Sequence, residues 1–247
     1  MSKPLAGKTA LVTGGSRGIG AAIAQRLAAD GAAVALTYAG SAQKAAGVAA
    51  AIEAAGGQAL ALKADSADPE AVRAAVAETV QVFGRLDILV NSAGILKLGA
   101  IGDFSLEDFD QMIAVNVRGM FLAVQEASRR MEDGGRIILI GSVNGDRMPF
   151  AGGSVYALTK AAVGGFTRGL ARDLGPRRIT VNNIQPGPVD TDMNPADGPS
   201  ADFLRQTQAL QRYAEPSEIA ALAAYLAGPE AGYMTGASLT IDGGFAT

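Results

Sequence analysis

Thr9-Ala-Leu-Val-Thr-Gly-Gly-Ser-Arg-Gly-Ile-Gly20 is a short apolar run followed by a glycine-rich turn. The apolar residues 10–12 predict a β-strand. The segment AAIAQRLAADG (21–31), with apolar residues at every third or fourth position, predicts a helix that ends at Gly31. Glycines let the backbone reverse direction and let a pyrophosphate approach the N–H groups at a helix N-terminus. Together these elements form the first half of a nucleotide-binding βαβ unit, for which an ordinary structural turn is the alternative.

The composition restricts the chemistry that this chain can perform. Its 247 residues are 49% hydrophobic and 18% charged, which is sufficient for one large α/β domain. A net charge of -3 argues against a nucleic acid polymer as a partner. The chain has no cysteine and no histidine, which excludes disulfides, Ser-His-Asp triads and the usual zinc sites, so we expect no metal. Acid–base chemistry must therefore use Tyr, Lys, Asp, Glu or Ser.

The sequence also bears on where the protein works. The N-terminal segment MSKPLAGK lacks the apolar core of a signal peptide. No apolar run has the length that is needed to span a bilayer. We therefore expect a cytoplasmic protein without a membrane partner.

Strands and helices alternate along nearly the whole chain. Six further segments have the length and composition of buried strands: 33–38, 58–65, 86–94, 136–142, 180–187 and 237–244. Helical patterns lie between them, including a long one that follows Ser105 and covers residues 106–131. This alternation predicts an α/β fold with a doubly wound parallel sheet of about seven strands, covered by helices on both faces. We expect a single domain over residues 1–247.

One long irregular region interrupts this alternation. It covers residues 186–200 and is followed by a short helical pattern to about Tyr213. A loop of that length in a compact domain is typically functional, so we predict a substrate lid at about 188–213. Ligands of a doubly wound sheet bind beyond the C-terminal ends of the strands. Four residues that follow predicted strands should therefore face one crevice: Gly14, Asn91, Ser142 and Pro186.

Tyr156 and Lys160 lie four residues apart on a predicted helix, so their side chains project from one face. A free tyrosine has a pKa of about 10, and a neighbouring ammonium group favours its ionised form. The pair is therefore a candidate acid–base group in which we expect the pKa of the tyrosine to be lowered. The alternative is a helix with one aromatic residue in the core and one lysine at the surface.

Two polar residues have positions that suit a catalytic role. Ser142 ends a predicted strand at the crevice, where its hydroxyl group can bind a substrate carbonyl; a helix cap or turn is the alternative. Asn116 lies inside a predicted helix, where asparagine is unfavourable because its side chain competes for backbone hydrogen bonds. Its alternative role is that of a buried amide that bends the helix.

These motifs, in this order and spacing, resemble those of the short-chain dehydrogenase/reductase family along essentially the whole chain. They are TGGSRGIG (13–20), NSAG (91–94), Asn116, Ser142, Tyr156-Ala-Leu-Thr-Lys160 and PGPVDTDM (186–193). The resemblance implies a Rossmann-type domain that usually forms homotetramers. It departs at one position, since the family's NNAG motif is NSAG here, with Ser92 in place of an asparagine.

The resemblance also implies a catalytic tetrad of Asn116, Ser142, Tyr156 and Lys160. Tyr156 would protonate the substrate oxygen as a hydride leaves the nicotinamide, and Ser142 would hold that oxygen. Lys160 would bind the hydroxyl groups of the nicotinamide ribose and lower the pKa of Tyr156. Asn116 would hold a water molecule that links Lys160 to solvent.

The residues after the second predicted strand favour NADP(H) over NAD(H). An NAD site places an acidic side chain there, whereas this chain has Tyr38-Ala-Gly-Ser41 and no carboxylate. Tyr38 and Ser41 can donate hydrogen bonds to a 2′-phosphate, and Arg17 in the glycine turn can pair with it. In similar family members an arginine at that position accompanies NADP use; a solvated loop charge is the alternative for Arg17.

Further cofactor contacts follow from the same resemblance. They are expected at the glycine turn, the adenine, the adjoining ribose, the catalytic pair and the nicotinamide carboxamide. The residues at the glycine turn are Gly14, Ser16, Gly18, Ile19 and Gly20, and those at the adenine are Asp65 and Ser66. The residues at the adjoining ribose are Asn91, Ala93 and Gly94, and the catalytic pair is Tyr156 and Lys160. The residues at the nicotinamide carboxamide are Pro186, Gly187, Val189 and Thr191.

The substrate loops are compatible with more than one function. The chain is similar to 3-oxoacyl-carrier-protein reductases and related bacterial ketoreductases, which implies a small-molecule carbonyl substrate. Segments 37–41, 141–149 and 185–199 are closer to a branch of the family associated with cyclic-di-GMP binding and biofilm dispersal. A nucleotide-binding protein on a dehydrogenase scaffold is therefore one alternative, and an inactive structural subunit is another. The candidate contacts to a bis-phosphate nucleotide are Arg147, Arg205, Arg212 and Asp146.

Overall fold

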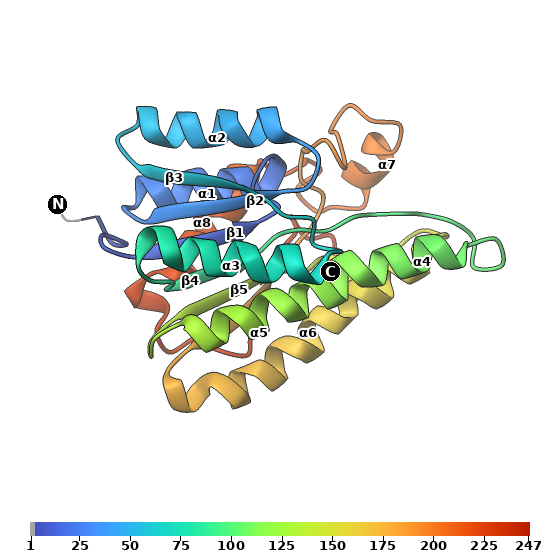
Figure 1. Ribbon diagram of the computed structural model, residues 1–247. Coiled ribbons are helices and arrows are strands. Elements are labelled where there is room, and N and C mark those ends of the chain that lie inside the picture. The colour runs from blue at the N-terminus through green and yellow to red at the C-terminus, as the bar shows by residue number, and fades with distance from the viewer. Residues whose placement is uncertain (1–2) are drawn as a thin grey trace.

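The computed structural model describes residues 3–247 and arranges them around one β-sheet. Within these residues the sheet has seven strands, all parallel, in the order β3-β2-β1-β4-β5-β6-β7, which confirms the predicted doubly wound sheet (Figure 1). The strands are β1 (Thr9–Thr13), β2 (Ala33–Tyr38), β3 (Gln58–Lys63), β4 (Ile88–Asn91), β5 (Arg136–Ile140), β6 (Thr180–Pro186) and β7 (Ser238–Ile241). Among residues 3–247, none of the helices combines the length and the hydropathy that a membrane-spanning helix needs.

Helices cover both faces of the sheet, because successive strand residues point to opposite faces and both faces are apolar. In β1, Ala10 and Val12 belong to one core and Leu11 belongs to the other. Figure 1 shows α3 and α5 in front of the sheet and α1 behind it. The first core packs against α1 (Gly18–Ala29), α2 (Ala42–Ala54) and α8 (Pro216–Ala227), and the second against α3 (Pro69–Phe83), α5 (Met120–Arg130) and α6 (Ser154–Leu174).

The predicted helical segment over residues 106–131 is helical as far as Arg130, but it is not α-helical throughout. α4 (Leu106–Ile113) passes into a π-helical turn, Ala114–Gly119, before α5 begins. The turn contains Asn116, whose side-chain amide bonds to the backbone of Ile95. Turns of this kind occur frequently at functional sites.

The region between β6 and α8 contains the predicted lid, called the lid below, and lies beyond the C-terminal ends of the strands. Its helix, α7 (Ala201–Gln206), ends well before Tyr213, so the predicted helical stretch is too long. Val189 and Ala214 form an isolated β-bridge that joins the two ends of the lid. In Figure 1, α7 lies on the side of the molecule opposite the N-terminus.

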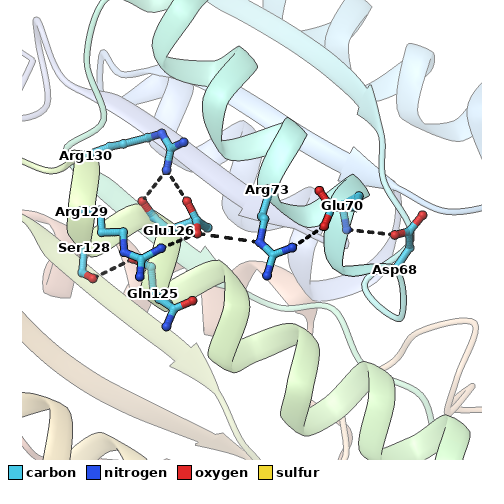
Figure 2. A network of polar contacts seen from close by, with 8 residues as sticks. All are labelled: Asp68, Glu70, Arg73, Gln125, Glu126, Ser128, Arg129 and Arg130. Carbon is cyan, nitrogen blue, oxygen red and sulfur yellow. Dashed lines mark hydrogen bonds and ion pairs between the residues drawn. The ribbon is translucent and has the colours of Figure 1, made fainter.

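A polar network joins α3 to α5 outside the second core (Figure 2). Glu126 on α5 is buried and accepts hydrogen bonds from Arg129 Nη1, at 2.9 Å, and from Arg130. Arg73 Nε on α3 lies 3.9 Å from Oε1 of the same carboxylate. The Arg130 guanidinium holds the pKa of Glu126 below its ordinary value. One buried anion therefore links two helices that cover the same face of the sheet.

Candidate active site

The glycine turn lies between β1 and α1 at the C-terminal edge of the sheet. Gly14 and Gly18 have φ values of 67° and 53°, which residues with a Cβ atom rarely adopt. A Cβ atom on Gly14 would also lie 2.8 Å from the Cα of Ala93. The N–H of Gly14 donates to the Thr37 hydroxyl group at 3.1 Å, which holds the turn against β2. Within residues 3–247 no side chain caps the N-terminus of α1, so its N–H groups are available to a pyrophosphate.

A cavity of about 780 Å³ opens at this edge of the sheet. It extends from the glycine turn, past the ends of β4 and β5, to the lid. Of the predicted catalytic and cofactor-binding residues, only Asn91 and Asn116 are outside its lining. Those that line it are Gly14, Ser16, Arg17, Gly18, Ile19, Gly20, Tyr38, Ser41, Asp65, Ser66, Ala93, Gly94, Ser142, Tyr156, Lys160, Pro186, Gly187, Val189 and Thr191.

The two asparagines form hydrogen bonds with segments next to the cavity. Asn91 ends β4, where its side-chain oxygen accepts a hydrogen bond from the Thr13 hydroxyl group at 3.2 Å. Asn116 Oδ1 accepts from the Ile95 N–H at 2.8 Å. Its Nδ2 donates to the Ile95 carbonyl at 2.9 Å and to Thr159 Oγ1 at 3.1 Å. Asn116 is thus a satisfied buried amide, and it fixes the loop after β4 against the π-helical turn.

Tyr156 and Lys160 lie near the start of α6 and both line the cavity. Lys160 Nζ is 5.8 Å from the centre of the Tyr156 ring and donates to the Ile140 carbonyl at 3.0 Å. Burial raises the pKa of Tyr156 to about 12 and lowers the pKa of Lys160 to about 8. The pKa of Tyr156 is therefore raised and not lowered as expected, because burial disfavours the charged form of both groups. The phenol is neutral at neutral pH and can donate a proton.

Ser142 reaches Tyr156 because a tight turn follows β5. The Ser142 hydroxyl oxygen caps this 3-10 turn by accepting a hydrogen bond from the Asn144 N–H at 3.1 Å. A Cβ atom on Gly145 would lie 2.8 Å from the carbonyl carbon of Lys160, so this glycine lets the turn approach α6. A hydrogen bond between the Ser142 and Tyr156 side chains then limits the rise in the pKa of the tyrosine.

Four residues that the sequence analysis did not single out contribute to the site. Thr37 binds the glycine turn, and Thr159 donates to the Tyr156 carbonyl at 2.8 Å. Phe150 and Phe245 line the cavity and pack with residues of the lid. Thr159 lies inside the Tyr-x-x-x-Lys motif, so its position next to Lys160 in the sequence could have indicated that it belongs to the site. Nothing in the local sequence connects Phe245, near the C-terminus, with the cavity.

The lid end of the cavity carries large apolar side chains beside polar residues such as Asp192 and Asn194. Leu98, Met193 and Phe203 line it with relative exposures of 54%, 49% and 47%. Large apolar side chains that are exposed together at one cavity are typical of a ligand-binding surface. The charged residues in the described lining are Arg17, Asp65, Lys160 and Asp192.

The three arginines considered for a bis-phosphate ligand are held by contacts within the chain. Arg147 lies over the Phe245 ring, 5.5 Å from its centre. Arg205 and Arg212 form ion pairs with nearby carboxylates at 2.8 and 2.7 Å. None of the three belongs to the described lining of the cavity, and Asp146 already accepts a side-chain hydrogen bond at 2.8 Å.

The sequence and the fold were compared with those of known proteins. A family model described as enoyl-(acyl carrier protein) reductase matches residues 14–246. The chain is 51% identical, over 97% of both chains, to the cyclic-di-GMP-binding biofilm dispersal mediator protein of Escherichia coli strain K12. It is 61% identical to a short-chain dehydrogenase/reductase structure from Serratia marcescens and 56% identical to a short chain dehydrogenase structure from Burkholderia cenocepacia in complex with NADP. Each likeness has a TM-score of 0.98 and covers 99% of this chain and 100% of the other. The chain therefore belongs to the short-chain dehydrogenase/reductase family.

Proposed function

We propose that this protein is an NADP(H)-dependent ketoreductase that transfers a hydride between the nicotinamide and a carbonyl or alcohol substrate. The observation that carries the proposal is the convergence of Ser142, Tyr156 and Lys160 with the glycine turn at one cavity. A protein that only binds a nucleotide has no physical need for a tyrosine and a lysine at this spacing on the cavity wall.

The residues of the cavity suit an NADP(H) molecule. The glycine turn and the uncapped N-terminus of α1 would hold its pyrophosphate. Arg17, Tyr38 and Ser41 would hold the adenosine ribose with its 2′-phosphate, and no carboxylate in the segment 38–41 would repel that phosphate. The NADP complex of the Burkholderia relative supports this assignment. When bound, the cofactor supplies or accepts the hydride.

The side chains of this protein would orient the substrate and move the proton. Ser142 would donate a hydrogen bond to the substrate carbonyl oxygen beside Tyr156. The neutral phenol of Tyr156 would pass its proton to that oxygen as reduction proceeds. The Lys160 ammonium lies close enough to the ring to stabilise the phenolate that remains.

The large apolar side chains at the lid end favour a bulky, uncharged carbonyl compound as the substrate, and the Asp192 carboxylate there would repel an anionic one. Leu98, Met193 and Phe203 offer contact to hydrocarbon or to a ring, and each buried methylene group contributes about 0.8 kcal/mol to binding. A substrate carboxylate or phosphate placed there would lose its hydration without gaining a cationic partner. Of the two cations in the described lining, Lys160 already binds the Ile140 carbonyl and Arg17 lies beside the Asp192 carboxylate.

The test measures NADPH oxidation by the full-length protein with a panel of ketones, each paired with an analogue that carries a carboxylate. We expect turnover of the uncharged compounds. Tyr156→Phe should lower turnover about a hundredfold or more while NADPH binding is retained. Tyr233→Phe is the matched control, because Tyr233 is fully exposed and outside the cavity lining. Full turnover by the Tyr156→Phe variant would refute the proposed mechanism.

Binding of cyclic di-GMP is a second candidate function, supported by the name of the Escherichia coli relative. A ligand with two phosphate groups needs cationic groups at its site, and Arg147, Arg205 and Arg212 all lie outside the described lining of the cavity. Calorimetric titration with cyclic di-GMP separates the two functions. Heat at micromolar ligand that falls in an Arg147→Ala variant would establish binding, and absence of heat at high ligand concentration would dismiss it.

A further inference from the structure

A lid carboxylate joins two cations beside the glycine-turn end of the cavity, whose described lining includes Asp192 and Arg17 but not Lys44. Asp192 Oδ2 accepts a hydrogen bond from Lys44 Nζ and lies 3.7 Å from Arg17 Nη1. Asp192 belongs to the lid, Lys44 to the first turn of α2 and Arg17 to the glycine turn. Three segments that are distant in the sequence therefore meet at one oxygen atom.

The two cations are placed to hold one small anion. Both reach the same carboxylate oxygen, and a phosphate monoester offers three such oxygens with a larger negative charge. Lys44 also lies in the first turn of α2, where the helix macrodipole favours a negative charge. The Lys44 ammonium holds the pKa of the Asp192 carboxyl below its ordinary value, so Asp192 is an anion at neutral pH.

These ion pairs are exposed and therefore exchangeable. The side chains of Arg17, Lys44 and Asp192 have relative exposures of 57%, 55% and 51%. Ion pairs with this exposure contribute little to stability and are screened by salt. A dianionic group that enters the cavity can take the place of the carboxylate without disturbing the core.

The cluster lies close to the expected position of the adenosine ribose. Tyr38 and Ser41 line the cavity at the end of β2. Ser41 is the N-cap residue of α2, and its carbonyl accepts the N–H of Ala45, so Lys44 is one helical turn away. In the described part of the chain, Asp192 is the one ion-pair partner of Lys44.

We propose that Lys44 is a second residue, besides Arg17, that binds the 2′-phosphate of NADP(H), and that Asp192 occupies both cations until the phosphate replaces it. This inference rests on the proposed use of NADP(H) by the same cavity. It assigns to Lys44 a role in selecting NADP(H) over NAD(H). It also couples the seating of the cofactor to the release of a lid residue.

The test compares the dissociation constants of NADPH and NADH, measured by cofactor fluorescence on the full-length protein. Lys44→Gln removes the charge but keeps a good helix former. We expect its dissociation constant for NADPH to rise about tenfold, the scale of one charge-assisted hydrogen bond, and that for NADH to stay within about twofold. Lys3→Gln, the same substitution at an exposed lysine before β1, is the matched control and should change neither constant.

Asp192→Asn should act in the opposite direction, because it removes the competing anion. We expect NADPH to bind roughly threefold more tightly and NADH to be unaffected, with the difference vanishing at high salt. The inference is overturned if Lys44→Gln leaves NADPH binding unchanged or weakens NADPH and NADH equally, or if Asp192→Asn weakens NADPH. Wild-type protein that binds neither cofactor would overturn the proposed function itself, so the two failures are distinguishable.

Discussion

Gly20→Ala and Gly47→Ala are the same substitution in two neighbouring helices, and we expect them to have opposite effects. Gly20 is the third residue of α1, and Gly47 lies in the middle of α2. Inside a helix, alanine is more stable than glycine by about 1 kcal/mol, because glycine loses more backbone freedom on folding. That gain applies at both positions, so the surroundings of the new Cβ atom decide the sign.

The structure supplies the opposing contribution at only one of the two sites. A Cβ atom on Gly20 would lie 3.0 Å from the carbonyl carbon of Gly14, nearer still to its oxygen, and 3.2 Å from the Cα of Gly15. These backbone atoms cannot yield without opening the glycine turn, and overpacking of this kind costs about 1–3 kcal/mol or more. Among the described residues, apart from the chain neighbours and the nearby backbone of α2 itself, no heavy atom lies within 4 Å of a Cβ atom on Gly47. We expect Gly20→Ala to lower the free energy of unfolding by about 1–2 kcal/mol and Gly47→Ala to raise it by about 0.5–1 kcal/mol.

Two measurements check this expectation. Urea unfolding at a fixed protein concentration compares the two variants with the wild type. Titration with NADPH tests the consequence for the site, since a turn opened by Gly20→Ala should bind NADPH at least roughly tenfold more weakly, a loss of about 1.4 kcal/mol. If Gly20→Ala is as stable as Gly47→Ala and binds NADPH like the wild type, the argument from backbone contact across the turn is refuted.

Buried polar groups provide further tests. Thr159→Val leaves the Asn116 amide with one acceptor fewer and should lower both kcat and the free energy of unfolding, the latter by about 1–2 kcal/mol. Thr159→Ser should restore both in steady-state kinetics and urea unfolding; a fully active, stable valine variant would contradict a positioning role. Glu126→Gln should destabilise the fold by about 1 kcal/mol at neutral pH in the same unfolding assay. The pKa of Glu126 is lower in the folded state than in the unfolded state, so Glu126 stabilises the fold above its unfolded pKa and stops doing so as pH falls through its folded pKa. A difference in free energy of unfolding between Glu126→Gln and the wild type that persists unchanged in acid would argue against this. Because burial lowers the pKa of Lys160 to about 8 and raises that of Tyr156 to about 12, kcat for ketone reduction should be constant at lower pH and fall as Lys160 loses its charge. A pH profile of kcat that first falls near the ordinary lysine pKa would show that burial does not control this step.

The inner strands were predictable because they are buried on both faces, whereas the edge strands β3 and β7 are partly exposed. Leu11 and Val12 have no exposed surface, so the segment reads as a continuous apolar run in the sequence itself. Glycines were equally informative where the backbone needs a missing Cβ atom, as at Gly14 and Gly18. The resemblance of the motifs then led to the family, which the comparisons confirmed.

Features that depend on contacts between distant segments were not predictable. The π-helical turn contains Asn116, whose side chain is hydrogen-bonded to the backbone of Ile95. The sequence pattern of the helix by itself does not indicate this contact with another segment. The pKa of Tyr156 rises because the folded chain removes the ring from water, a cause that outweighs the hydrogen bond with Ser142. The homotetramer and the cytoplasmic location stay predictions.

Local sequence was therefore sufficient for the order of the elements, the glycine turn, the Tyr156–Lys160 pair and the missing carboxylate after β2, because each depends on neighbours along the chain. Packing alone determined the burial of that pair, the place of Phe245 in the cavity and the meeting of two cations at Asp192. The burial of a side chain and the ion pairs it forms depend on residues that are far apart in the sequence, so both are determined only when the whole chain is folded.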